Sequence, residues 1–226
     1  MVHEHISTVF DIELDELRQD ILVMGGKVEL MIANSIKSLV DRDTPLAVRT
    51  IAMDHEVNGA EVRIDERCLE LLALRQPVGR DLRFITIALK IVTDLERMGD
   101  QCANIAKRTR ELNEEPPLKP YIDIPRMAHG TEIMVKEALD AFVRGDAELA
   151  VKVCRDDSFV DDLNIQVQRE LLTFMIEDTS TISRAIKINY ISKSLERIAD
   201  HATNIAEMVI FMVKGKDIRH TTAVAS

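Results

Sequence analysis

The sequence predicts an all-α protein made of two tandem three-helix bundles related by internal duplication. Apolar residues recur at three- and four-residue steps over long stretches, and no stretch alternates as a β-strand does. The run Leu95–Asp100 returns one hundred residues later as Leu195–Asp200. The chain of 226 residues is 46% hydrophobic, with 10 Met and no Trp. This composition supplies a sizeable aliphatic core, which suits helices better than strands.

The first copy is expected to contain three helices. Apolar periodicity and the breaker residues between the segments place these helices at about residues 4–40, 44–75 and 81–112. Thr44 is expected to cap the second helix, because Pro45 follows it at the first helical position. Gly25 and Gly26 interrupt the first helix, and each weakens it by about 1 kcal/mol relative to Ala. Close approach of another helix would explain these two glycines.

A proline-rich segment at residues 114–125 divides the chain. It contains four of the six prolines. Because proline cannot continue a helix, this density predicts a stiff linker. The expected organisation is therefore a first repeat over residues 1–113, a second repeat over residues 126–214, and a loose tail over residues 215–226.

The second copy follows the first with a small shift in register. Asp43 matches Asp146 at an offset of 103 residues, and by the last helix the offset is 100 residues. These offsets predict helices at about residues 126–144, 146–177 and 181–214. Residues 91–107 and 191–207 share eight of seventeen positions, four of them polar. A duplicated core requires only shared apolar positions, so the shared Glu, Arg, Asp and Asn indicate a polar function in each copy.

Charge and composition exclude several classes of protein. The formal net charge of −10 and the pI near 5.1 argue against a nucleic-acid partner, which normally requires a basic face. No apolar run approaches the roughly 20 residues of a membrane-spanning helix. The N-terminal residues have neither a basic start nor an apolar segment, so no secretory signal is expected. The three cysteines lie in helical patterns, which favours reduced thiols in a cytoplasmic protein.

The sequence also shows no motif typical of an enzyme active site. No Glu-x-x-His pair occurs, which argues against a ferritin-like di-iron oxidase. No glycine-rich phosphate loop occurs, and no Ser, Cys or Lys lies in a recognisable nucleophile motif. We therefore expect a protein that is not an enzyme.

Paired carboxylates mark the last helix of each copy. Glu96 and Asp100 lie four residues apart at the border of the apolar arc, as do Glu196 and Asp200. Two carboxylates at this spacing repel each other by roughly 0.2–0.5 kcal/mol on an exposed helix. If the middle and last helices pack side by side, these pairs would meet a second set of polar side chains. That set comprises Asp54, Asn58, Glu61, Asp157 and Asp161.

Two interpretations of these clusters remain open from the residue types alone. A group of side-chain oxygens with few sulfurs or imidazoles suits a hard cation or iron. Alternatively, arginines neutralise the acids as interhelical salt bridges, because guanidinium pairs well with carboxylate. The arginines concerned are Arg80, Arg83, Arg97 and Arg197.

Several motifs together resemble the PhoU family of bacterial phosphate-signalling proteins. The resemblance rests on the duplicated Leu-Glu-Arg-x-x-Asp run and on five short motifs. These motifs are Met24–Gly26, Arg75–Pro77, Asp81–Arg83, Met175–Asp178 and Asp217–His220. The motifs recur in the right order in both halves, and the resemblance covers nearly the whole chain, from His5 to about His220. The resemblance implies the same fold as the offsets do, two similar three-helix bundles.

The resemblance also implies a function. PhoU-like proteins are cytoplasmic negative regulators of the phosphate-starvation response that also restrain phosphate uptake. The expected partners are a sensor histidine kinase and the ATPase subunit of the high-affinity phosphate ABC transporter, and the protein would reach the membrane only through them. We also expect a homodimer. The alternative function is that of a helical protein that stores or senses metal, with an iron cluster as its purpose.

The family further implies a metal ligand set. Some members bind clusters of iron or other metals through a Glu/Asp-x-x-x-Asp motif, and other members lack such clusters. The motif is present here at Glu96/Asp100 and Glu196/Asp200. Candidate ions are iron, zinc, manganese, magnesium and nickel. Asn58 occupies the position of Asp161 in the second copy, so the first cluster is expected to differ from the second.

Arg97 and Arg197 are the remaining shared charges. On a helix each points about 100° away from the preceding glutamate. We therefore expect both at a partner-facing or interhelical surface. The alternative is that each arginine simply pairs with a neighbouring helix.

Overall fold

The computed structural model describes residues 2–215, with side chains from residue 9 onward. It contains six long α-helices and, within the described residues, no strand, which confirms the predicted all-α class. The helices are α1 (Val2–Val40), α2 (Thr44–Arg75), α3 (Gly79–Asn113), α4 (Asp123–Arg144), α5 (Ala147–Glu177) and α6 (Ile182–Lys214), and the 3₁₀ turn η1 (Thr179–Thr181) precedes α6. The motif Asp217–His220 and all of the predicted tail except Gly215 lie outside the described residues.

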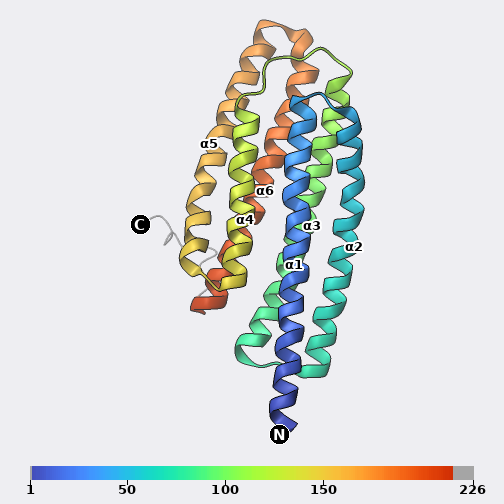
Figure 1. The fold of residues 1–226 in the computed structure, drawn as a ribbon. Coiled ribbons are helices and arrows are strands. Elements are labelled where there is room, and N and C mark those ends of the chain that lie inside the picture. The colour runs from blue at the N-terminus through green and yellow to red at the C-terminus, as the bar shows by residue number, and fades with distance from the viewer. Residues whose placement is uncertain (1, 216–226) are drawn as a thin grey trace.

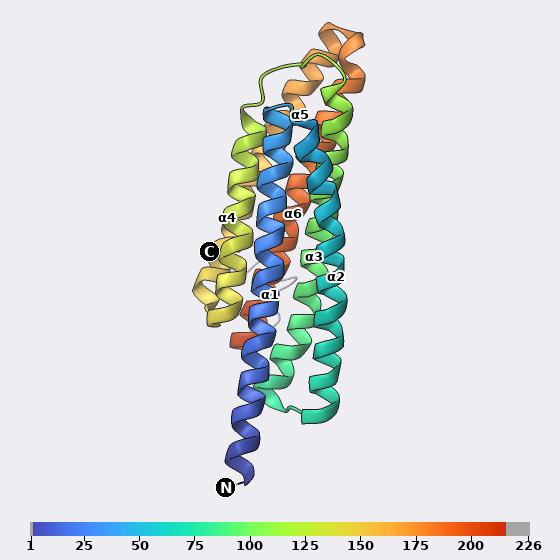
Figure 2. The same cartoon turned by 45° about the vertical axis from the view of Figure 1, so that its right-hand side comes forward.

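The helices form two antiparallel three-helix bundles that lie side by side (Figure 1). α1, α2 and α3 pack together as one bundle, and α4, α5 and α6 as the other. α3 and α6 run antiparallel against each other in the middle, and α1 packs on α4, as both views show (Figure 2). α3 still packs mainly against α1 and α2, as expected for a duplicated unit.

The two bundles share one continuous hydrophobic core. At one end Phe84 of α3 stacks on Phe142 of α4 with ring centroids 5.2 Å apart, and both rings are buried. Nearer the middle, Nδ1 of His201 in α6 lies 2.8 Å from Oδ1 of Asp94 in α3. Both contacts join one repeat to the other. The proline-rich linker therefore does not separate two independent cores.

Gly25 is explained by a close approach of two helices, whereas Gly26 is not. A Cβ atom at Gly25 would lie 2.2 Å from Cδ1 of the buried Leu139 in α4. No heavy atom lies within 4 Å of a Cβ built at Gly26. The glycine at position 25 therefore permits the contact between α1 and α4 that holds the repeats together.

Asp43, and not Thr44, caps α2. The Asp43 side chain accepts a hydrogen bond from the backbone N–H of Leu46 at 2.8 Å, so Thr44 already lies in the first helical turn. Asp146 caps α5 in the same way. The match between Asp43 and Asp146 at an offset of 103 residues was the signal for this shared role. Carboxylates suit this position because they accept hydrogen bonds from unpaired N–H groups.

The linker is shorter than predicted, because α4 begins at Asp123 and not at residue 126. Pro125 lies in the first turn of α4, where its missing N–H would have no helical partner. The linker is also held at its start. Nη2 of Arg42 donates to the carbonyl of Glu115 at 2.6 Å, and Nζ of Lys187 pairs with the Glu115 carboxylate at 2.8 Å. These bonds connect it to both repeats.

The cysteines form no disulfide among the described residues. All three cysteines are free, with Cys68 and Cys102 buried and Cys154 partly buried. Burial raises the pKa of Cys68 to about 12, so this thiol stays protonated and unreactive near neutral pH. Among the described residues, no helix is apolar over a length sufficient to cross a membrane.

We predict that Gly25→Ala and Gly26→Ala have opposite effects on stability. Each substitution should raise the free energy of unfolding by about 0.5–1 kcal/mol, because Ala has a better helix propensity than Gly. Only Gly25→Ala displaces the buried Leu139, and overpacking of this kind costs about 1–3 kcal/mol. Gly25→Ala should therefore be the less stable of the two by that amount in urea denaturation. Equal stabilities would show that Leu139 moves aside without cost.

Candidate metal centre

The first carboxylate cluster forms where α2 and α3 pack side by side. Gly99 of α3 allows the close contact, since a Cβ there would lie 3.2 Å from Cγ1 of Val57 and 3.5 Å from Oδ1 of Asp54. The charge of Asp100 raises the pKa of Asp54, Glu61 and Glu96, which places these side chains around a common region. The five predicted residues of this cluster are Asp54, Asn58, Glu61, Glu96 and Asp100.

The surroundings of this cluster disfavour the ionised form of its carboxyl groups. Burial is the largest cause of the raised pKa of Asp54, and the nearby carboxylate of Asp100 is the second. The pKa of Glu96 is raised by burial and then by Asp100, Glu61 and Asp54 in turn. Like charges that share a partly dry site destabilise each other's ionised forms. A cation placed among these side chains would relieve that repulsion.

The second cluster forms in the equivalent place between α5 and α6 and contains Asp157, Asp161, Glu196 and Asp200. Burial, followed by the charges of the other three acids, raises the pKa of Asp157 to about 6. One compensating charge is present, because Nζ of Lys193 forms an ion pair with the carboxylate of Glu196. The predicted convergence of the middle and last helices therefore holds in both repeats.

Unpaired oxygen atoms are the feature that fits a cation. Oδ1 of Asp54 and Oδ1 of Asn58 are buried without a hydrogen-bond partner in the first cluster, although the Asn58 side chain lies close enough to Asp54 to lower the pKa of its carboxyl. In the second cluster, Oδ1 of Asp157 and Oε2 of Glu196 are likewise buried without a hydrogen-bond partner. A buried oxygen that makes no bond costs about 1–3 kcal/mol, and oxygen ligands suit hard cations. The donor set therefore fits a metal ion.

The ligands are not already gathered around one point. Within the described residues, no three His, Cys, Asp or Glu side chains have the geometry of a formed metal site. A cation bound in either cluster would have to draw the carboxylates closer together than they lie now.

The arginines do not neutralise the clusters. Among the ion pairs of the described residues, none involves the four arginines considered for that role, which are Arg80, Arg83, Arg97 and Arg197. All four are exposed. Arg97 lies close enough to lower the pKa of Glu61 and Glu96 slightly, against the larger effect of burial. The salt-bridge interpretation is therefore wrong for these residues.

Asp65 belongs to the first cluster although the sequence did not predict it. Asn104 lies elsewhere, apart from the acids that precede it on α3. Asp65 lies one turn beyond Glu61, its charge raises the pKa of Glu61, and its own Oδ1 is buried without a partner. The four-residue spacing of Glu61 and Asp65 was the available signal, but position 168 in the second copy is Gln. Asn104 lines a hollow between α3 and α6 together with Arg197, and does not join the acids.

These features define a class of protein, a duplicated helical bundle with a carboxylate cluster in each half and some buried oxygens in each cluster that lack a hydrogen-bond partner. The PhoU domain model matches residues 21–109 and again residues 124–209. The chain is 44% identical over 217 residues to the phosphate-specific transport system accessory protein PhoU homolog of Pseudomonas aeruginosa, covering 96% of this chain and 90% of that protein. It is 36% identical over 219 residues to the phosphate-specific transport system accessory protein PhoU of Escherichia coli, covering 97% of this chain and 91% of that protein.

Solved structures agree with the sequence relatives. The crystal structure of PhoU from Pseudomonas aeruginosa matches with a TM-score of 0.88 at 43% identity, covering 92% of this chain and 100% of that one. The phosphate transport system regulatory protein PhoU from Streptococcus pneumoniae matches with a TM-score of 0.85 at 31% identity, covering 92% and 98%. The chain therefore belongs to the PhoU family, which confirms the resemblance found in its sequence.

We predict that the folded protein becomes more stable as the pH falls from 7.5 to 5. The pKa of Asp157 rises from 3.8 in the unfolded chain to about 6 in the folded chain, so the folded chain binds this proton more tightly. The stabilisation is complete below the unfolded pKa and is lost as the pH rises through about 6. After allowance for solvent screening, we expect a gain of about 1 kcal/mol in urea denaturation.

The matched control for this prediction is Asp156, the acid next to Asp157 in the sequence, which forms an ion pair with Lys152. Asp157→Asn should flatten the dependence of unfolding free energy on pH. Asp156→Asn should leave it in place, because the Asp156 carboxylate already pairs with Lys152 at 2.8 Å. A profile that is the same in wild type and Asp157→Asn would assign the dependence to other groups.

Proposed function

We propose that this protein is an accessory regulator of phosphate transport that acts without catalysing a reaction. The observation that carries the proposal is the match over nearly the whole chain to relatives named as accessory proteins of a phosphate-specific transport system. Both halves match the same domain, so the proposal applies to the complete two-bundle body. The long helices support such a role because they leave extended outer faces for partners (Figure 1).

The finer proposal is a cytoplasmic negative regulator of the phosphate-starvation response. It would link a sensor histidine kinase to the ATPase subunit of the phosphate ABC transporter, and it would act as a homodimer. Arg97 and Arg197 are the candidate partner contacts, since both are exposed and neither belongs to an ion pair among the described residues.

A phosphate-response reporter tests this function. In phosphate-rich medium, deletion of the gene should switch the reporter on, and the wild-type chain should switch it off again. Arg97→Glu and Arg197→Glu should restore repression poorly, because charge reversal repels a partner that the arginine attracts. The control is Arg155→Glu, a reversal at an exposed arginine on α5.

Purified variants separate signalling from stability. Each should keep wild-type helicity and melting temperature while its binding to the transporter ATPase and the kinase weakens. A reporter that stays silent in the deletion strain would contradict the regulatory role. Unchanged binding with a lowered melting temperature would assign the two arginines to the bundle itself.

A second candidate function is metal storage or sensing. The observation that favours it is the presence of buried, unpaired carboxylate oxygens in both clusters. Asp54, Glu96, Asp157 and Glu196 would supply central ligands to iron or to zinc, manganese, magnesium or nickel. In that case the bound cation would offset the repulsion among the acids and stiffen the contact between neighbouring helices.

We predict that removing four carboxylates abolishes cation binding. The variant combines Glu96→Gln, Asp100→Asn, Glu196→Gln and Asp200→Asn. After incubation with iron, zinc or manganese and removal of free ions, elemental analysis should find metal in wild type only. Bound metal should also raise the melting temperature of wild type, since it binds the folded state alone. Binding should weaken below about pH 6, where Asp157 is protonated.

The control for charge removal is an exposed acidic pair with the same spacing. Glu66→Gln combined with Glu70→Gln removes two exposed carboxylates from α2, outside the cluster. This variant should retain metal. Equal metal content in wild type and the fourfold variant would remove the cation proposal.

A further inference from the structure

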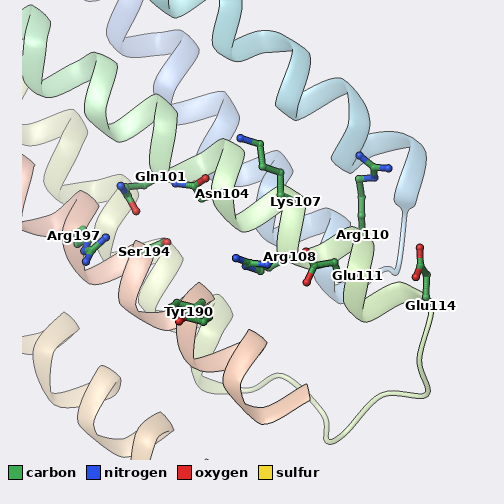
Figure 3. A pocket seen from close by; sticks show the side chains of 10 residues that line it. All are labelled: Gln101, Asn104, Lys107, Arg108, Arg110, Glu111, Glu114, Tyr190, Ser194 and Arg197. Carbon is green, nitrogen blue, oxygen red and sulfur yellow. Dashed lines mark hydrogen bonds and ion pairs between the residues drawn. The ribbon is translucent and has the colours of Figure 1, made fainter. Parts of the chain in front are cut away.

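Two equivalent hollows lie along the contact between α3 and α6. The first, of about 500 Å³, is lined by Asn104 of α3 and by Arg197 of α6, among others (Figure 3). The second, of about 580 Å³, is lined by Arg97 of α3 and Asn204 of α6. Since the two helices are antiparallel and match at an offset of 100 residues, each hollow receives the arginine of one repeat and the asparagine of the other.

The duplication has diverged in a way that changes the charge of the hollows. The second hollow contains Asp94, whose carboxylate lies 2.8 Å from the His201 ring, and also contains Asp65. The positions equivalent to Asp94 and His201 are Ser194 and Gln101, and both line the first hollow. The second hollow therefore has two acids beside Arg97 and Lys90, whereas the residues of the first hollow that correspond to Asp94 and His201 are uncharged.

A second guanidinium group, that of Arg108, lies in the first hollow beside its ion-pair partner Glu111. Arg108 replaces the apolar Met208 of the equivalent position. Its guanidinium lies 5.4 Å from the centre of the Tyr190 ring, and its Nη1 pairs with Glu111 at 2.8 Å. These contacts hold the Arg108 fork in one orientation, which lowers the entropy lost when it binds a ligand.

The groups that face the space between the helices are visible in Figure 3. Arg108 and Glu111 extend from α3 on the side of α6, whereas Lys107 and Arg110 point away from α6. Arg197 forms no ion pair with any described residue. Besides these two guanidinium groups, the lining includes Glu111, whose carboxylate is paired with Arg108, and Glu114. It also includes the neutral side chains of Gln101, Asn104 and Ser194.

We propose that this hollow binds a phosphoryl group, either as free phosphate or as part of a small phosphorylated molecule. Guanidinium forks match tetrahedral oxyanions, and neutral amide and hydroxyl donors can bond the oxygens that the forks do not reach. The chain has a net charge of −10, so a hollow with excess positive charge is a local exception. Its volume lies in the range of small-molecule sites. This inference goes beyond the regulatory role proposed above and does not depend on it.

Calorimetric titration with inorganic phosphate and, separately, with ATP tests the site. Phosphate binding identifies a site for the free ion, whereas binding of ATP alone identifies a site for a phosphoryl group carried by a larger molecule. In either case Arg197→Gln should weaken binding by at least about tenfold, because it removes a charge-assisted hydrogen bond. Added salt should weaken it further.

The duplicated structure supplies the matched controls. Arg97→Gln removes the equivalent arginine from the other hollow and should leave the affinity unchanged. Ser194→Asp introduces the acid that the other repeat carries at this position, and it should abolish binding by charge repulsion. Circular dichroism should show unchanged helicity for Arg197→Gln, whose side chain is exposed.

Tyrosine fluorescence provides an independent reading at the site itself. The chain has no Trp and two Tyr, so the Tyr121→Phe variant leaves Tyr190 as the sole emitter of this kind. Ligand that engages Arg108 should change the Tyr190 emission, because the guanidinium lies over that ring. The proposal is overturned if neither ligand binds wild type at millimolar concentration. It is also overturned if Arg197→Gln binds as tightly as wild type, or if Arg97→Gln weakens binding equally.

Discussion

The antiparallel packing of α3 against α6 is the constraint on which the rest of the structure depends. Each of these helices is covered by the two other helices of its own repeat and by its counterpart in the other. Apolar residues therefore occupy most of their circumference, and polar groups remain only along the edges where neighbours meet. Glu96 and Asp100 occupy the edge beside α2, while Arg97 lies at the edge beside α6. The acidic clusters and the basic hollow both result from this restriction.

The acidic clusters are retained at a cost to stability. Burial and mutual repulsion raise the pKa of Asp54, Glu96 and Asp157, so each group is less favourable when ionised in the folded chain. Some of their oxygens are also buried without a partner. A duplicated core would gain nothing from such groups in both copies. Oxygen donors of this kind suit a hard cation, which is why metal binding is proposed above for both clusters.

The two repeats have diverged in the groups that they place at equivalent positions. Asp94 and His201 join the repeats by a hydrogen bond, and the equivalent Ser194 and Gln101 instead line an open hollow. The outer faces also differ. Nζ of Lys27 pairs with Glu56 across α1 and α2 at 2.6 Å, whereas the matching positions in the second repeat are glycine and an exposed phenylalanine. The two repeats therefore share one helix arrangement but expose different side chains at equivalent positions.

The sequence by itself determined the helices, the duplication and most members of the acidic clusters, because apolar periodicity and residue spacing are local properties. Asp65 was missed, since its equivalent in the second copy is Gln168. It could not determine how the repeats join. Gly25 predicted a close contact, but only the tertiary structure identified Leu139 as the neighbour. Likewise, the shared Asn104 was visible in the sequence, yet its place beside Arg197 depends on the antiparallel approach of α3 and α6. Contacts between residues about one hundred positions apart arise from packing between helices, and no local pattern encodes them.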